Sequence, residues 1–155
     1  MSAKRPSAAL DDISKAIIEL LQEDGRRPYS DIAKAVGLSE AAVRQRVQRL
    51  TESGVIQIVA VTDPVQMGFA RQAMVGIKVS GDTRRVAEAL SALPFVIYVV
   101  LTAGSFDVIA EVVCEDDEEL IELLNTRIRT LDGVMSTETL VYLKLQKQQY
   151  NWGTR

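Results

Sequence analysis

The stretch GLSEAAVRQRVQRL, residues 37–50, has the pattern of a short amphipathic helix with an unusual polar face. Its apolar stripe, at helical spacing, consists of Val43, Val47 and Leu50. The opposite face carries arginines and glutamines with a single acid, Glu40. The two-turn segment SDIAKAVG, residues 30–37, precedes this helix and ends on a glycine. A short helix, a tight turn and a second helix with a polar outer face predict a helix-turn-helix.

Short polar side chains mark the expected starts of these helices. We expect Asp11 to cap a first helix, in LDDISKAIIELLQEDGR, and Ser30 and Ser39 to cap the two helices of the motif. Helix N-termini also attract phosphate oxygens through their free N–H groups and the helix dipole. Ser30 and Ser39 are therefore candidate contacts to a DNA backbone.

The polar face of residues 37–50 has the chemistry of a DNA reader. Arginine pairs with guanine and glutamine with adenine in the major groove, and Arg46, at the edge of the stripe, is placed to reach a phosphate. The predicted residues that contact double-stranded DNA are Ser30, Ser39, Glu40, Arg44, Gln45, Arg46, Gln48 and Arg49. The alternative is a solvated basic face on a buried helix, which leaves the scarcity of acidic partners at i±4 unexplained.

The rest of the chain has a different period. VIQIVAVTDP, residues 55–64, alternates and is β-branched, which predicts a strand pair or wing. Strand patterns then follow over residues 72–81, 95–104, 106–116 and 135–146, and helix patterns over residues 82–94 and 117–133. In the second of these helices we expect Leu120, Ile121, Leu124 and Ile128 to face inward. The order βαββαβ predicts a ferredoxin-like α+β domain with two helices on one face of an antiparallel sheet.

These patterns divide the chain into five parts. We expect a disordered tail (1–9), a winged helix-turn-helix domain (10–63), a hinge (64–71), a ferredoxin-like domain (72–148) and a C-terminal tail (149–155).

The segment FVIYVVL, residues 95–101, is apolar on both of its alternating faces. One set is Phe95, Ile97, Val99 and Leu101, and the other is Val96, Tyr98 and Val100. Two helices cover only one face of a sheet, so the second set predicts a sheet-to-sheet homodimer through Val96, Tyr98 and Val100. The alternative is that the DNA-binding half covers this strand.

Two segments together carry a family resemblance. YSDIAKAVGLSEAAVRQRVQRLTESGVI, followed by a βαββαβ domain with TAGSFDV at its central turn, resembles the Lrp/AsnC (feast/famine) regulators of bacteria and archaea. The resemblance runs from about residue 10 to about residue 147 and includes Gly104 and Asp107 of the turn. It implies a DNA-binding transcription regulator that forms dimers and responds to an amino acid or a related small metabolite, with residues 72–148 as the effector-binding and dimerisation domain. Members of the family often assemble further into a homo-octamer, and the sequence does not decide between dimer, tetramer and octamer.

The resemblance also places an effector pocket at the central turn, between subunits. The expected effector-binding residues are Thr102, Ala103, Gly104, Ser105, Phe106, Asp107, Thr137 and Thr139. Gly104 supplies freedom for a tight turn whose amides receive an α-carboxylate, and Asp107 holds an α-ammonium group or is a plain turn residue. Many members of the family have tyrosine where this chain has Phe106, so the effector's identity does not transfer.

The composition argues against other classes of protein. The 155 residues include one cysteine, Cys114, which excludes an internal disulfide, and no histidine, which removes the commonest general base and metal ligand. The acidic run EDDEEL, residues 115–120, is expected to start a helix with a capping box of Asp116 and Glu119. We therefore expect no enzyme activity, no cofactor and no metal. With neither an apolar span nor a secretory signal, a cytoplasmic protein is expected.

Overall fold

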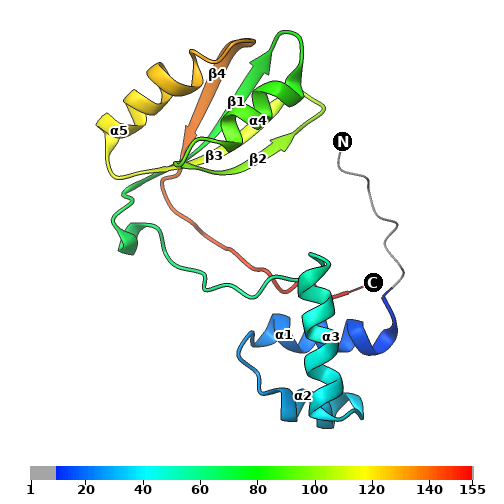
Figure 1. Cartoon of the computed structure of the whole chain (residues 1–155). Helices are drawn as coiled ribbons and strands as arrows, with labels where there is room; N and C mark the ends of the chain where they lie inside the picture. The colour runs from blue at the N-terminus through cyan, green and yellow to red at the C-terminus, as the bar shows by residue number, and fades with distance from the viewer. Residues whose placement is uncertain (1–9, 155) are drawn as a thin grey trace. The chain divides into compact units, whose positions relative to one another are not determined.

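The computed structural model describes residues 10–154, which form two compact units (Figure 1). The first contains residues 10–60 together with 147–154, and the second contains residues 61–146. The predicted tail at residues 1–9 lies outside the described residues. No helix in the described part of the chain combines the length and the apolar character that crossing a membrane requires.

Three helices build the first unit: α1 (Asp12–Glu23), α2 (Tyr29–Val36) and α3 (Glu40–Glu52). Its core consists of Ile17, Leu21, Ile32, Ala33, Val43 and Val47. Asp11 caps α1 as predicted, since its carboxylate accepts from Ser14 N at 2.8 Å. Near the C-terminus, Gly153 N donates to Gln22 Oε1 at 3.0 Å, so the segment predicted as a free tail bonds to α1.

The turn between α2 and α3 follows the predicted pattern with one correction. Gly37 ends α2 with a left-handed φ of 69°, and Ser39 Oγ accepts from Ala42 N at 3.2 Å to cap α3. The prediction that Ser30 caps α2 is wrong, because α2 already begins at Tyr29 and its N-cap is Pro28. The fixed φ of Pro28, −59°, suits the residue before a helix, and Ser30 therefore lies within the first turn.

The predicted strand pair or wing at residues 55–64 is also wrong. Residues 56–63 take neither helical nor strand conformation, and a short 3₁₀ turn, η1 (Val65–Met67), follows them. Their β-branched composition favours extended backbone, but a strand also needs a neighbour for its hydrogen bonds. Val59 and Val61 accordingly stay exposed.

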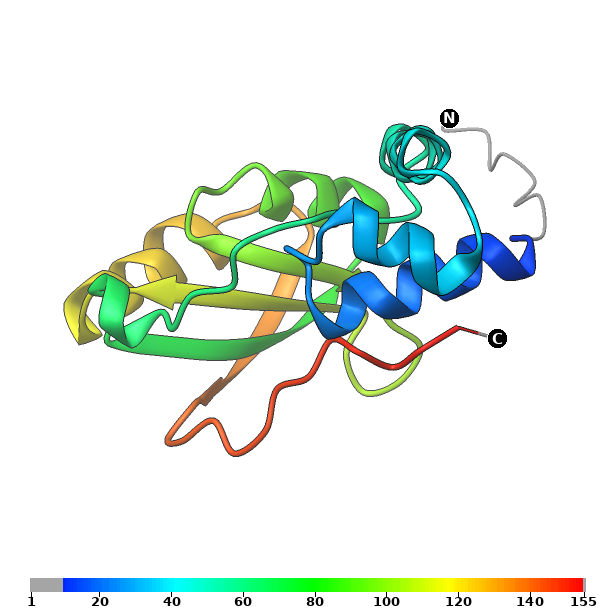
Figure 2. The same ribbon diagram turned by 90° about the horizontal axis from the view of Figure 1, so that it is seen from below.

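The second unit has the predicted βαββαβ order. Its elements are β1 (Arg71–Val79), α4 (Thr83–Ser91), β2 (Val96–Leu101), β3 (Val108–Cys114), α5 (Asp117–Glu122) and β4 (Val134–Val141). The strands form one antiparallel sheet in the order β2-β3-β1-β4. Figure 2 shows α4 and α5 on the same side of this sheet.

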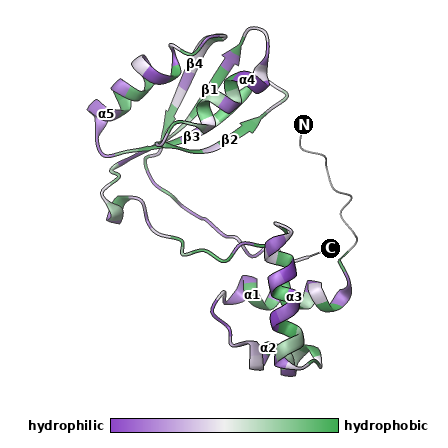
Figure 3. Cartoon of the chain, in the orientation of Figure 1, coloured by the Kyte–Doolittle hydropathy of each residue, from purple (hydrophilic) through white to green (hydrophobic). Residues whose placement is uncertain are grey.

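Alternate residues of β1 and β3 pack under these helices and form the core of the second unit. The strand residues of this core are Ala73, Val75, Ile77, Val108, Ala110, Val112 and Cys114. Cys114 is fully buried, and burial raises the pKa of its thiol to about 11. In Figure 3 the two central strands are largely green (hydrophobic), whereas α3 shows long purple stretches.

The helical segment that begins with α5 departs from its predicted pattern at one residue. After α5 the chain continues as a π-helical turn, η2 (Leu123–Ile128), and Leu123 is buried. Leu120, Leu124 and Ile128 are buried as predicted, but Ile121 is 50% exposed. Because Leu123 and Ile121 lie on opposite sides of Leu120 around the helix, burial of Leu123 turns the apolar stripe away from Ile121.

Candidate DNA-binding surface and effector region

Helix α3 presents the polar face that the sequence predicted. Val43, Val47 and Leu50 are buried in the first unit, which fixes the rotation of the helix about its axis. The exposed residues of α3 and its cap include Ser39, Glu40, Arg44, Gln45, Gln48 and Arg49. Six of the eight predicted DNA contacts therefore lie together on the exposed surface of α3 and its cap.

Two of these exposed side chains have partners one turn away. Arg44 Nη2 lies 2.7 Å from Glu40 Oε1, and Gln48 Nε2 donates to Glu52 Oε1 at 2.8 Å. The guanidinium of Arg44 also lies over the ring of Tyr29, 5.3 Å from its centroid. Glu40, the single acid noted in the sequence, is thus the partner of Arg44, whereas Arg46 and Arg49 have no acidic residue at i±4.

Arg46 takes a different direction from its neighbours on α3. Its Nη1 donates to Asp11 Oδ2 at 2.7 Å and to Ser14 Oγ at 3.1 Å, which ties α3 to the start of α1. Hydrogen bonds from Ser14, and then from Arg46, lower the pKa of Asp11 to about 2. The guanidinium predicted to reach a phosphate thus already has partners inside the first unit.

In the second unit, the predicted effector turn between β2 and β3 is closed by its own hydrogen bonds. Thr102 N donates to Asp107 O at 2.9 Å, and Thr102 Oγ1 donates to Phe106 O at 2.7 Å. Ala103, Gly104 and Ser105 are exposed at its tip. The tip does not use the special freedom of glycine, since Gly104 has no positive φ.

Asp107 ties this turn to the neighbouring strand. Its Oδ2 accepts from Val79 N at 2.8 Å, next to the register shift of β1 at Lys78 and Val79, and its own N–H donates to Ile77 O at 3.0 Å. Among the described residues, the Asp107 carboxylate accepts from neither Gly104 nor Ser105 within its own turn. The carboxylate instead holds the end of β1, where the bulge interrupts regular pairing.

The predicted effector residues lie on two faces of the sheet. Thr137 and Thr139 pair with Ile77 and Val75, and so face the helices. Thr137 Oγ1 accepts from Arg129 Nε at 3.0 Å, whereas Thr139 Oγ1 is buried with no hydrogen-bond partner among residues 10–154.

Phe106 lies on the opposite face of the sheet, away from α4 and α5, which we call the open face. A Cβ built on Gly76 would come within 2.6 Å of its ring, and Gly76 points away from the helix-covered core. A single chain therefore does not bring Thr137 and Thr139 together with the Phe106 ring. The predicted pocket lies between subunits, so its grouping of these threonines with Phe106 stays a prediction.

The open face of the sheet contains two of the three predicted dimer residues. Val96 pairs with Val112 and packs on the core, because a bulge at Ile97 shifts the register of β2. The prediction for Val96 is therefore wrong. Beyond the bulge, Tyr98 and Val100 pair with Glu111 and Ile109 and lie on the open face.

Residues of the other strands also lie on the open face, and the sequence pattern of β2 did not predict them. Met74 and the 53%-exposed Leu140 form a cross-strand pair there, beside a polar group around Glu111. Gln72 Nε2 donates to Glu111 Oε1 at 2.7 Å. Burial, and then the charge of Glu111, raise the pKa of Tyr142 to about 12.

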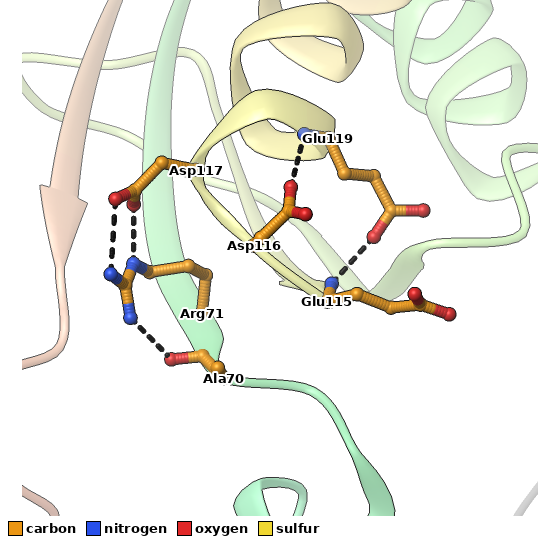
Figure 4. Close-up of polar contacts among 6 residues, drawn as sticks. All are labelled: Ala70, Arg71, Glu115, Asp116, Asp117 and Glu119. Atoms are coloured by element: carbon orange, nitrogen blue, oxygen red, sulfur yellow. Dashed lines mark hydrogen bonds and ion pairs between the residues drawn. The ribbon is translucent and has the colours of Figure 1, made fainter.

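The acidic residues 115–119 at the start of α5 have a structural role (Figure 4). Asp116 Oδ1 accepts from Glu119 N at 2.9 Å, which confirms the predicted cap. Glu119 Oε2 accepts at 2.5 Å from Glu115 N, one residue before the Asp116 N–H that a capping box uses. Arg71 pairs with Asp117 through two nitrogens, one of them Nη2 at 3.0 Å from Asp117 Oδ2. This pair fastens the first residue of β1 to α5.

A helix-turn-helix unit joined to a four-stranded α+β unit defines a two-domain DNA-binding regulator. Two family models match: the AsnC-type helix-turn-helix domain over residues 10–51, and the PF0864 C-terminal dimeric alpha+beta barrel domain over residues 69–155. The chain belongs to the Lrp/AsnC family of transcriptional regulators.

Individual relatives agree with this assignment. The HTH-type transcriptional regulator FL11 of Pyrococcus furiosus is 38% identical over 141 residues, which cover 90% of this chain and 93% of FL11. The leucine response regulatory protein (LrpA) of Mycobacterium tuberculosis is 30% identical, with a TM-score of 0.81 over 90% of this chain and 96% of LrpA. The Neisseria meningitidis regulator NMB0573, crystallised with L-Met, shares the fold at 22% identity and a TM-score of 0.79, over 92% and 95% of the two chains. These relatives are regulators, not enzymes.

Proposed function

We propose that this regulator recognises a specific DNA sequence by placing α3 in the major groove. The observation that carries the proposal is the exposed face of α3, whose opposite side is fixed in the core of the first unit. A rigidly held helix can place its polar side chains against base edges, and one α-helix fits the major groove of B-DNA.

Each polar residue of this face has a role that fits its chemistry. Arg44 and Arg49 are matched to guanine O6 and N7, Gln45 and Gln48 to adenine N6 and N7, and Glu40 to the amino group of cytosine. Ser39 and Ser30 lie at helix N-termini, where N–H groups favour phosphate oxygens. Arg46 supports the surface from behind through its bonds to α1.

The same proposal includes a homodimer formed through the open sheet face. Tyr98, Val100, Met74 and Leu140 offer apolar surface there, and a second copy of the sheet is a self-complementary cover. A dimer presents two copies of α3, and one helix alone reads too few base pairs for specificity. Family membership supports dimerisation, and assembly of dimers up to an octamer is part of the proposal.

We further propose that the second unit senses an amino acid or a similar small metabolite at the β2–β3 turn. The exposed tip at Ala103, Gly104 and Ser105 can offer backbone N–H groups to the carboxylate of an amino acid. Asp107 follows this tip in the chain and can hold the ammonium group of the same ligand. The leucine response of LrpA and the L-Met bound to NMB0573 support this class of ligand. Thr102 and Phe106 shape the turn, whereas Thr137 and Thr139 face the helices and are left out.

The DNA-binding part is tested by single substitutions on duplexes selected by the protein. Arg44→Ala or Gln48→Ala should reduce preference at one base position by about 1–3 kcal/mol and leave the other positions unchanged. Arg85→Ala, which removes an exposed arginine from the second unit, is the charge-matched control and should leave base preference intact. Equal losses on every sequence would instead indicate an architectural DNA binder, and no DNA binding at all would indicate a ligand-binding or assembly module.

The effector part is tested separately by adding each of the twenty amino acids at saturating concentration. At least one should change the sedimentation profile or the affinity for a selected duplex, because a ligand shifts an assembly only through unequal affinity for its states. If none of the amino acids changed either quantity, amino-acid sensing would be rejected while DNA recognition stood.

A further inference from the structure

Arg44 is held on two sides before any DNA is present. Its Nη2 is 2.7 Å from Glu40 Oε1, one turn earlier on α3, and its Cζ lies 5.3 Å from the centre of the Tyr29 ring. Tyr29 belongs to a different helix, α2, and packs against the buried cluster of the first unit. The guanidinium of Arg44 therefore contacts both a carboxylate of its own helix and an aromatic ring that packs on the core.

These two contacts restrict the rotamers of an exposed arginine before it binds DNA. The side chain of Arg44 is 63% exposed, and a free arginine at this exposure samples many rotamers, whose loss on binding lowers the affinity for a base. A cation over an aromatic face is attracted to it, and a guanidinium stacked in this way keeps its in-plane N–H groups available. Two such groups are what a bidentate contact to guanine requires.

We propose that Tyr29 is a positioning residue for base recognition: its ring orients Arg44 so that one position of each half-site prefers guanine. The inference rests on the proposed recognition of DNA by α3 and adds a residue outside that helix. The aromatic face, rather than the hydroxyl, is the active feature, because it is the ring that lies under the guanidinium. The Glu40 carboxylate also restrains Arg44, because it accepts a hydrogen bond from Nη2 of the same guanidinium.

The experiment measures base preference at the position that Arg44→Ala relaxes, using duplexes selected by the wild-type protein. Tyr29→Leu keeps an apolar anchor without an aromatic face, Tyr29→Phe keeps the face without the hydroxyl, and Tyr150→Leu is the control elsewhere in the first unit. We expect Tyr29→Leu to lower the guanine preference at that position by about two- to fivefold, the range of an exposed cation–π contact. Tyr29→Phe and Tyr150→Leu should stay within about twofold of wild type.

The readouts separate positioning from loss of fold. Thermal unfolding is recorded for every variant, and Tyr29→Met supplies a second apolar replacement if Tyr29→Leu unfolds. With Arg44→Ala already present, Tyr29→Leu should change base preference no further. The proposal is overturned if Tyr29→Leu leaves the guanine preference intact, weakens all sequences alike, or still alters the preference without Arg44. A wild-type protein that prefers no base at any position would reject the proposed function itself.

Discussion

Replacing Gly76 by alanine tests how the β2–β3 turn is held against the sheet. A Cβ at this position would lie 2.6–2.7 Å from Cδ2, Cε2 and Cγ of Phe106. Because Cγ does not move when the ring turns about χ2, relief of the clash requires a new χ1 rotamer of Phe106 or a shift of the turn. Overpacking of this kind costs about 1–3 kcal/mol of unfolding free energy. The backbone at Gly76 has no positive φ, so alanine adds no strain of its own.

The assay is a double-mutant cycle followed by thermal or denaturant unfolding. Gly76→Ala alone should lower the melting temperature of the second unit, by about 4–8 °C for each kcal/mol in a domain of this size. With Phe106→Ala present the clash is gone, and Gly76→Ala should be neutral or stabilising by about 0.4–1 kcal/mol. The two substitutions should therefore be coupled by at least about 1 kcal/mol. Additive effects, or a stable Gly76→Ala variant in the wild-type background, would refute this packing.

Three further predictions follow from charges and exposed surface. The pKa of Asp11 is lowered to about 2, so its contribution to stability is present above the unfolded pKa of about 3.9 and is lost as the pH falls through 2; Asp11→Asn, which still caps α1, should remove this dependence from acid unfolding curves. The pKa of Tyr142 is raised to about 12, so its contribution to stability is present below the unfolded pKa of about 10 and is lost as the pH rises through 12. Tyr142→Phe should remove the ionisation step near pH 12 from an ultraviolet titration of the tyrosines. Val100→Asp should shift sedimentation toward monomer and weaken binding to two-half-site duplexes, and an unchanged dimer would exclude the open face as the interface.

The sequence was sufficient for features that depend on local period. The stripe of Val43, Val47 and Leu50 determined which face of α3 is exposed, and the change from helical to alternating spacing identified both units of the fold. The caps at Ser39 and Asp116 were likewise predictable, because the donor and acceptor lie three residues apart.

Features that depend on partners distant in sequence were not predictable. Arg46 was expected on a phosphate, but its partner Asp11 lies 35 positions earlier in the chain. The bulge at Ile97 moved Val96 to the core face, since one extra residue inverts the alternation of a strand. The face of the sheet on which Thr137 and Thr139 lie was not predictable either, because only the register of β4 against β1 assigns them to a face.

The most direct test of the account is selection of genomic duplex fragments by the purified protein at near-physiological salt, with Arg44→Ala selected in parallel. The account predicts enrichment of pseudo-palindromic sites whose half-sites share a guanine, and loss of preference at that guanine in the variant. Retention without enrichment of any sequence, or identical sites for wild type and Arg44→Ala, would contradict the claim that α3 reads the DNA.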